Sequence, residues 1–353
     1  MYHVFSAKTY HLTPHLIEST IEKIPNDHFF IIMGPENVPV NWKLYSSLFQ
    51  KLNFKKFLFA TSLSELRQIA DLDKKSLIIL HGDSYIRMLY FYKKKYKNVH
   101  WVCWGSGTKI NKSLKSYFSA ILKKKIYKFF KSIITLNEVD HIELQRNFKL
   151  SKIHTIPYLG SLHNMQNFKK ENLQSTKSNN LVYIGNNSSC LPSYPEMIRK
   201  LAQFSPAVGV QCMLNYDLVE DEFYTNLKNE AVLLFGDKFR MNTEFYELQD
   251  YPDYMNKCDI YICNVDRQSG LAAIYITLVL GKKLFLRGNN YNFIKSLGCI
   301  IYNVDEIEKM SSEDFLSPLA LSSKEINFDI IMEYLDDNNI IRKWNNFFAI
   351  YLN

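Results

Sequence analysis

The stretch Asp259–Val279, DIYICNVDRQSGLAAIYITLV, carries the pattern that decides the fold. The apolar run Asp259–Cys263 predicts a buried strand, and the longer apolar run that opens at Leu271 predicts a helix. Between them, Arg267–Gly270 (RQSG) forms a turn with a fixed positive charge, an amide and a glycine. Because a helix N-terminus presents unpaired N–H groups and a partial positive charge, this turn is a natural seat for a phosphate group.

A second loop of the same kind lies earlier in this half of the chain. The predicted strand Leu181–Ile184 is followed by Gly185, Asn186 and Asn187 and then by two serines. Such a loop offers backbone N–H groups and hydroxyl donors to a phosphate or a sugar hydroxyl, although an ordinary Gly-Asn turn has the same composition. Two loops of this type together predict a site for a nucleotide diphosphate carrier.

Strand-like and helix-like segments alternate along the whole chain, which predicts parallel sheets with crossover helices. We expect two doubly wound α/β domains, with ligands bound in a cleft at the carboxyl ends of the strands. The expected boundaries are a first domain 1–163, a polar linker 164–180, a second domain 181–325 and a helical tail 326–353. The expected strands of the second domain are 181–184, 208–213, 231–235, 259–263, 283–286 and 299–302.

Composition limits the class of protein. The 353 residues are 47% apolar, which supplies a sizeable core, and the six cysteines are scattered without zinc-ligand or disulfide spacing. We therefore expect buried, reduced thiols. The N-terminus reads as a strand and not as a signal peptide, and the longest apolar run is well short of the roughly 20 residues of a membrane helix. These features predict a cytoplasmic location.

Charge is divided unevenly. Residues 1–160 hold 25 Lys and Arg against 11 Asp and Glu, a net +14, whereas the remainder holds 18 against 24, a net −6. The basic stretches Lys93–Lys97 and Lys123–Lys131 carry aromatic residues, and the second has Lys124, Lys128 and Lys131 on one predicted helical face. This pattern favours an anionic membrane surface as partner. Lysines on a solvated face are the alternative, and no nucleic-acid-binding module is recognisable.

Candidate acid/base groups lie in the basic half. His81 directly follows a predicted strand and can accept a proton from an acceptor hydroxyl, and Asp83 can orient it or act itself. A histidine that merely caps a helix is the alternative. His3 and His15 are weaker candidates on the same rim. The dinucleotide and P-loop fingerprints are absent, and the chain shows no carboxylate cluster that implies a metal or another cofactor.

Several of these residues occur in one order that resembles a known family. The segments that carry the resemblance are His81-Gly82, Trp101-x-x-Trp104-Gly105, Gly185-Asn186, Tyr216, Cys258-Asp259, Arg267-Gln268-x-Gly270 and Asn290. With them the chain resembles the TDP-N-acetylfucosamine:lipid II N-acetylfucosaminyltransferase family, also called the 4-alpha-L-fucosyltransferase family. The resemblance runs from about His3 to about Phe293.

The resemblance implies a GT-B glycosyltransferase fold at the cytoplasmic face of the bacterial inner membrane. From the residues themselves we expect no metal, with Arg267, Gln268 and the backbone at Gly270 neutralising the leaving diphosphate. The resemblance implies transfer of a 4-acetamido-4,6-dideoxygalactose from a dTDP carrier to an undecaprenyl-diphosphate-linked saccharide, in enterobacterial common antigen or related surface polysaccharides. The second domain would hold the donor, and the first the acceptor. The expected donor residues are Gly185, Asn186, Asn187, Tyr216, Glu247, Arg267, Gln268, Gly270 and Asn290; the expected acceptor-side residues are His3, His15, Trp104 and Gly105.

Two positions depart from the family pattern. The family has an aspartate two residues after the Trp-Gly pair, where this chain has Gly107, and a second glycine where it has Ala272. We expect His81 or Asp83 to replace the missing carboxylate. Two other functions stay open: a transferase that uses a UDP- or GDP-sugar for O-antigen or capsule, and a membrane-associated scaffold without catalysis.

Overall fold

The computed structural model describes most of the chain. The described residues are 1–7, 13–24, 27–34, 57–60, 65, 72, 75–83, 86, 96–105, 107–108, 114–160, 165, 168–174, 179–186, 188–214, 222–244, 246 and 249–352. They divide into two compact units. Unit 1 comprises Met1–Gly160 and Leu335–Asn353, and unit 2 comprises Ser161–Tyr334.

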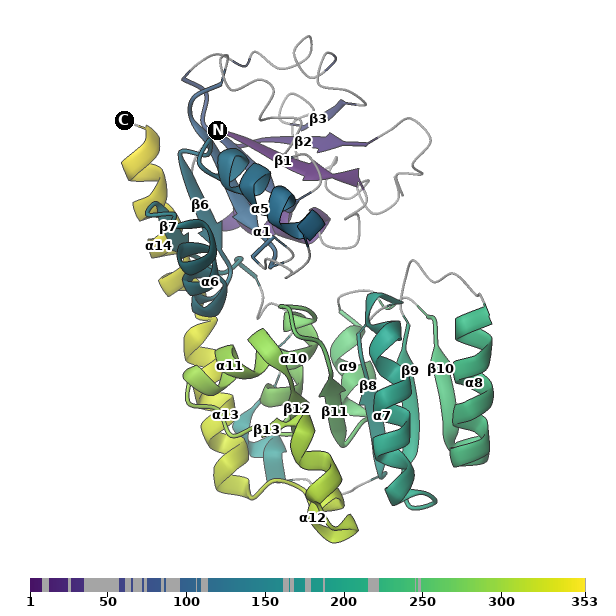
Figure 1. The fold of residues 1–353 in the computed structure, drawn as a ribbon. Coiled ribbons are helices and arrows are strands. Elements are labelled where there is room, and N and C mark those ends of the chain that lie inside the picture. The colour runs from purple at the N-terminus through teal and green to yellow at the C-terminus, as the bar shows by residue number, and fades with distance from the viewer. Residues whose placement is uncertain are drawn as a thin grey trace. The chain divides into compact units, whose positions relative to one another are not determined.

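The described part of unit 1 contains a parallel sheet of seven strands, in the order β3-β2-β1-β4-β5-β6-β7. Figure 1 labels β1, β2, β3, β6 and β7 of this sheet. The chain moves outward from β1 in one direction and then returns to start again at β4, so the strand order reverses between these two neighbours. The strands are β1 Tyr2–Ser6, β2 Phe29–Met33, β3 Phe57–Ala60, β4 Ile78–His81, β5 Val99–Cys103, β6 Ser132–Thr135 and β7 Ile153–Thr155; the helices are α1 Thr13–Lys23, α5 Leu114–Tyr127, α6 Glu138–Phe148 and α14 Asp337–Leu352.

Both faces of this sheet are buried, because successive side chains of a strand point to opposite sides. On β4, Ile78 and Leu80 pack into a core that includes Leu144 of α6. Ile79 packs into the opposite core, which includes Trp344 of α14. The near-continuous apolar strands that the sequence shows are therefore the signature of a sheet covered on two sides.

The last helix belongs to unit 1, although it follows unit 2 in the chain. The Trp344 indole N–H donates to the Pro157 carbonyl at 3.1 Å, and the Tyr351 carbonyl accepts from the Asn98 amide at 3.0 Å. The expected tail 326–353 thus holds parts of two helices in different units: α13, Leu321–Tyr334, lies in unit 2, and α14 in unit 1.

Unit 2 repeats the architecture with six strands among its described residues, ordered β10-β9-β8-β11-β12-β13 and all parallel (Figure 1). Here the order reverses between β8 and β11. The strands are β8 Leu181–Ile184, β9 Gly209–Met213, β10 Phe239–Asn242, β11 Ile260–Cys263, β12 Lys283–Leu286 and β13 Tyr302–Asn303. The α-helices are α7 Tyr194–Leu201, α8 Glu222–Phe235, α9 Tyr251–Asn256, α10 Leu271–Val279, α11 Gly288–Ser296, α12 Ser312–Leu316 and α13; the short 3-10 helices are η4 Lys170–Gln174, η5 Ser188–Ser193, η6 Ala202–Phe204, η7 Gly236–Lys238 and η8 Val304–Lys309.

The structure corrects one expected strand. Residues 231–235 are the last turn of α8, not a strand. Ala231 and Phe235 are buried, four residues apart, whereas Leu233 between them is 87% exposed. That spacing is the period of a helix, which a run of five apolar residues does not reveal by itself. The short strands β7 and β10 were not expected; the last strand, expected at 299–302, begins at Tyr302.

All six cysteines are buried and none forms a disulfide, as expected from their spacing. Among the described residues, no helix combines the length and the apolar character needed to span a bilayer.

Candidate functional site

The two loops singled out in the sequence meet in unit 2. They follow the adjacent parallel strands β8 and β11, between which the strand order reverses, and in such sheets this is where ligands bind. The Gly185 N–H donates to the Ile262 carbonyl at 2.9 Å, and the Ser269 hydroxyl donates to the Asn186 side chain at 3.4 Å. The topology of the sheet therefore joins segments that are more than 80 residues apart in the chain.

Asn290 of α11 holds the Arg267–Gly270 loop through hydrogen bonds to its backbone. Its amide oxygen accepts from the Ser269 N–H at 3.3 Å, and its amide nitrogen donates to the Ser269 carbonyl at 2.7 Å. Asn290 is 1% exposed. Because both ends of this buried amide are committed to one backbone residue, Asn290 positions the loop. The donor contact expected of Asn290 stays a prediction.

Two glycines in the loops have conformations and neighbours that exclude a side chain. Gly185 has φ +73°, and a Cβ on it would overlap the Tyr194 hydroxyl, which donates to the Met213 carbonyl at 2.5 Å. Gly270 has φ +66° and precedes α10; a Cβ there would lie 2.9 Å from the Asn186 side-chain nitrogen. These are left-handed backbone conformations that glycine adopts without strain.

Arg267 and Gln268 lie in the turn before α10. Arg267 is half-buried and its guanidinium donates to the Gln268 carbonyl at 3.3 Å. The positive charge of Arg267 therefore lies against the backbone of its own loop. The first turn of α10 holds no acidic side chain. Since the first N–H groups of a helix have no partner within it, this turn combines a cation with donors suited to an anion.

Sequence reasoning missed the residues that brace this loop. The Arg287 guanidinium lies 3.3 Å from the Glu196 carboxylate and donates to the Asn264 amide oxygen at 3.2 Å. The Asn264 amide nitrogen in turn donates to Glu196 at 3.1 Å. Asn264 directly follows β11 and Arg287 directly follows β12. Their position immediately after a parallel strand was the signal that could have identified them.

Three predicted donor residues, Asn187, Tyr216 and Glu247, lie outside the described residues. Ala272, which replaces the second glycine of the family pattern, is exposed at the start of α10.

In unit 1 the predicted histidines form a hydrogen-bonded chain. His81, the last residue of β4, contacts His3 Nδ1 through its Nε2 at 3.0 Å and the Tyr158 hydroxyl through its Nδ1 at 2.7 Å. His3 continues to His28 at 2.8 Å, and the Trp104 indole N–H donates to Tyr158 at 2.8 Å. His3 and His81 lie on one face of the sheet because His3 pairs with Ile79, two residues before His81.

This chain changes the interpretation of His81. His81 is 4% exposed, and burial lowers its pKa to about 3; burial, with the charges of His28 and His81, also holds the pKa of His3 well below its usual range. A neutral imidazole donates one hydrogen bond and accepts one. Both nitrogens of His81 already face protein groups, so this geometry favours a structural role and does not favour the predicted general base.

The other predicted residues of unit 1 lie around this chain. His15 donates from Nε2 to the Gly160 carbonyl at 3.0 Å, and Asp83 is half-buried two residues beyond His81. Trp104 is half-buried and Gly105 is buried, with φ +85°.

The described part of the chain holds no group of three or more His, Cys, Asp or Glu side chains arranged for a metal ion.

The packing around Gly107 leaves no room for a side chain. A Cβ at this position would lie 2.7 Å from the Tyr127 hydroxyl and 2.9 Å from the Trp101 ring. The Tyr127 hydroxyl donates to the Gly107 carbonyl at 3.1 Å, which holds the ring against the glycine. A carboxylate does not fit at this position in the present packing.

The sequence matches no protein-family model and no curated protein sequence. The fold matches many solved structures. Anabaena HepE in complex with UDP-glucose superimposes with a TM-score of 0.67 at 10% identity, covering 99% of each chain. A glycosyltransferase from Rickettsia africae has a TM-score of 0.65 at 14% identity, covering 99% of this chain and 98% of its own. For TarM the TM-score is 0.58 at 12% identity, and the match covers 82% of this chain but 57% of TarM.

These similarities define the class of fold. The chain has two Rossmann-like α/β domains and the architecture of the GT-B glycosyltransferases. At 10–14% identity, the matches establish the architecture alone.

The buried histidines predict acid sensitivity. A histidine whose native pKa is about 3 and whose ordinary value is 6.5 binds more protons in the unfolded state between these values, so stability falls as pH is lowered through this window. We expect His81→Gln to reduce the slope of unfolding free energy against pH by about 1.4 kcal/mol per pH unit between pH 4.5 and 6.

Urea unfolding at several pH values measures this slope independently of any overall loss of stability. His100→Gln gives a separate comparison, because burial also lowers the pKa of His100 to about 3. An unchanged slope in the His81 variant would show that this histidine is not held neutral.

Proposed function

We propose that this chain is a glycosyltransferase that binds a nucleotide-sugar donor at the carboxyl ends of β8 and β11. The observation that carries the proposal is the junction of the two loops, Gly185–Asn186 and Arg267–Gly270, at the point of strand-order reversal in a GT-B fold. Solved structures of similar fold include HepE with UDP-glucose and the pneumococcal O-GlcNAc transferase GtfA with UDP and GlcNAc. Those ligands support a nucleotide-sugar as the class of donor.

In this proposal Arg267, Gln268 and the first N–H groups of α10 stabilise the diphosphate that leaves the sugar. The guanidinium is permanently charged, and the loop that carries it is fixed by Asn290 before any ligand binds. Preorganised donors of this kind act where negative charge develops in the transition state. These donors neutralise the diphosphate as a bound metal ion would, so we propose a reaction that needs no metal ion.

For the acid/base group, Asp83 is the better of the two candidates. It is half-buried next to the end of β4, whereas His81 is enclosed by His3 and Tyr158. A carboxylate near an acceptor hydroxyl can take its proton if the reaction inverts configuration.

The finer assignment rests on the sequence motifs. The resemblance carried by the Arg-Gln-x-Gly loop and the Trp-Gly loop implies a dTDP-linked 4-acetamido-4,6-dideoxygalactose as donor and an undecaprenyl-diphosphate-linked saccharide as acceptor, in enterobacterial common antigen or O-antigen synthesis. A UDP- or GDP-sugar donor is the second candidate, favoured by the UDP-bound neighbours. The absence of a carboxylate at Gly107 is what supports a scaffold without catalysis.

A lipid-linked acceptor calls for a location at the inner membrane, and α5 offers a surface for it. Ile121 and Leu122 are 42% and 45% exposed, beside the exposed Lys125. The helix ends at Tyr127, so Lys128 and Lys131 lie in the following turn and not on the helical face that the sequence predicted. Of the other stretch, residues 93–95 lie outside the described residues. Exposed apolar side chains among lysines suit an anionic bilayer surface, and no nucleic acid is needed to explain them.

Replacing Arg267 tests the leaving-group role. We expect Arg267→Ala to lower kcat/KM by about 100- to 1,000-fold, because a fixed donor to the departing charge is lost. The assay uses dTDP-, UDP- and GDP-sugars with excess EDTA and a lipid-linked saccharide acceptor. Arg240→Ala, an exposed arginine on β10, is the matched control. Near-normal turnover without Arg267, or loss of wild-type activity in EDTA, would contradict this mechanism; the preferred donor decides between the nucleotides.

The base assignment is tested separately. Asp83→Asn should lower kcat by about 100- to 10,000-fold and leave donor affinity unchanged, since an amide cannot accept the proton. Steady-state kinetics with donor binding by calorimetry measures both quantities. Asp237→Asn at an exposed site of unit 2 is the control. A fully active Asp83 variant would rule out this carboxylate.

Vesicle binding tests the membrane surface. Replacing Lys124, Lys125 and Lys128 with glutamine should lower the affinity for phosphatidylglycerol vesicles about fivefold per lysine at low salt, as measured by co-sedimentation. The matched control replaces the exposed lysines of unit 2, Lys228, Lys295 and Lys309. Equal loss in both variants would indicate general charge attraction and not docking through α5.

A further inference from the structure

Unit 2 contains a pocket at the amino-terminal ends of its strands, opposite the candidate donor site. The pocket has a volume of about 170 Å³, and Ile260 and Lys283, the first residues of β11 and β12, line it. The candidate donor site follows the last residues of β8 and β11, so the two sites are at opposite ends of parallel strands. Nothing in the proposed transfer reaction uses this pocket.

Charge is unbalanced around the pocket. Four lysines line it, Lys169, Lys282, Lys283 and Lys324, against a single carboxylate, Asp259. That carboxylate accepts from the Asn179 and Leu181 backbone N–H groups at 2.8 and 3.1 Å. These bonds hold the carboxylate at the start of β8, and its single negative charge is outnumbered by the lysines of the pocket wall.

Two of these lysines are buried, which is costly for an ammonium group. Lys283 is 4% exposed and Lys324 is 8% exposed. Burial lowers the pKa of Lys283, and burial together with the like charge of Lys282 lowers the pKa of Lys324. Lys282 and Lys324 therefore repel each other across the pocket wall.

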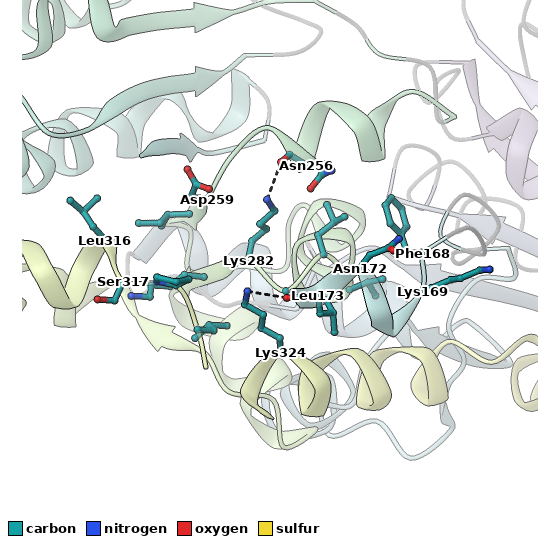
Figure 2. A pocket seen from close by; sticks show the side chains of 17 residues that line it. Phe168, Lys169, Asn172, Leu173, Asn256, Asp259, Lys282, Leu316, Ser317 and Lys324 are labelled. Carbon is teal, nitrogen blue, oxygen red and sulfur yellow. Dashed lines mark hydrogen bonds between the residues drawn. The ribbon is translucent and has the colours of Figure 1, made fainter. Parts of the chain in front are cut away.

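The lysines bond to backbone carbonyl groups. Lys282 donates to Asn256 at 3.0 Å and Lys324 to Leu173 at 3.2 Å, as Figure 2 shows. Lys283 donates to the Asp314 and Phe315 carbonyls at 2.6 and 3.1 Å. Carbonyl groups at the ends of short helices accept these hydrogen bonds but carry no full negative charge. Within the described residues, none of the three ammonium groups has a carboxylate within ion-pair distance.

We infer that this pocket binds a small oxyanion of the phosphate type, held by Lys282 and Lys324. An anion between these two ammonium groups removes their mutual repulsion and uses the N–H groups that the carbonyls leave. The Lys283 ammonium group is occupied by two carbonyls and lies 5.5 Å from the centroid of the Tyr302 ring, so it adds positive charge to the pocket wall without holding the anion. The volume is below the roughly 300 Å³ at which pockets begin to enclose larger ligands, which favours a single phosphate over a nucleotide. The source is inorganic phosphate or the phosphate group of a small sugar phosphate.

Thermal unfolding in phosphate tests the inference. At about ten times its Kd, inorganic phosphate should raise Tm by about 3–6 °C over potassium chloride of equal ionic strength. The shift should disappear in Lys324→Met and in Lys282→Met, and persist in Lys228→Met, which removes an exposed lysine of α8. If the Lys324 variant does not fold, the less buried Lys282 carries the test. Glucose 1-phosphate in a parallel series identifies the source.

Arg267→Ala separates this pocket from the donor site, which also attracts phosphate. Retention of the shift in Arg267→Ala and its loss in the two lysine variants supports the inference. Loss in Arg267→Ala with retention in Lys324→Met assigns the phosphate to the donor site and overturns it. No shift in the wild-type chain overturns it as well. UDP should stabilise the Lys324 variant in either case, so the donor proposal stands or fails separately.

Discussion

The candidate donor site depends on two hydrogen bonds between Asn290 and the backbone of Ser269. The buried Asn290 amide on α11 accepts from the Ser269 N–H at 3.3 Å and donates to the Ser269 carbonyl at 2.7 Å. Both backbone polar groups of this loop residue are therefore fixed. With the loop held this way, Gly270 has a left-handed conformation against Asn186, and α10 begins at a defined point. The N–H groups that we propose to bind an anion are therefore in place before a ligand arrives, which is what electrostatic preorganisation requires.

The strands were largely predictable because both sheets are buried on two faces. Leu181–Ile184 and Lys283–Leu286 are largely apolar runs, and their predicted limits agree with the structure. Residues 231–235 were misassigned because a short apolar run has no period of its own. The return of α14 to unit 1 was not visible in the sequence, since it depends on contacts such as that of Trp344 with Pro157, which are distant along the chain.

The meeting of the two loops was predictable, and the residues that support them were not. Gly185, Asn186 and Arg267 were singled out by their position after parallel strands, and the structure brings their loops together. The function of a polar side chain depends on what its other atoms contact, and no sequence pattern shows this. Asn290 and His81 were both singled out as polar residues in useful places, yet each is occupied on both sides by protein groups.

The packing at Gly107 has a consequence for how this chain can change. Tyr127 and Trp101 fill the space that a side chain at this position would enter, and the Tyr127 hydroxyl donates to the Gly107 carbonyl. A mutation to an acidic residue there is therefore unfavourable until the tyrosine is first replaced by something smaller. Because of this epistasis, the order of substitutions matters: position 107 can gain a side chain only after the ring at position 127 has been lost.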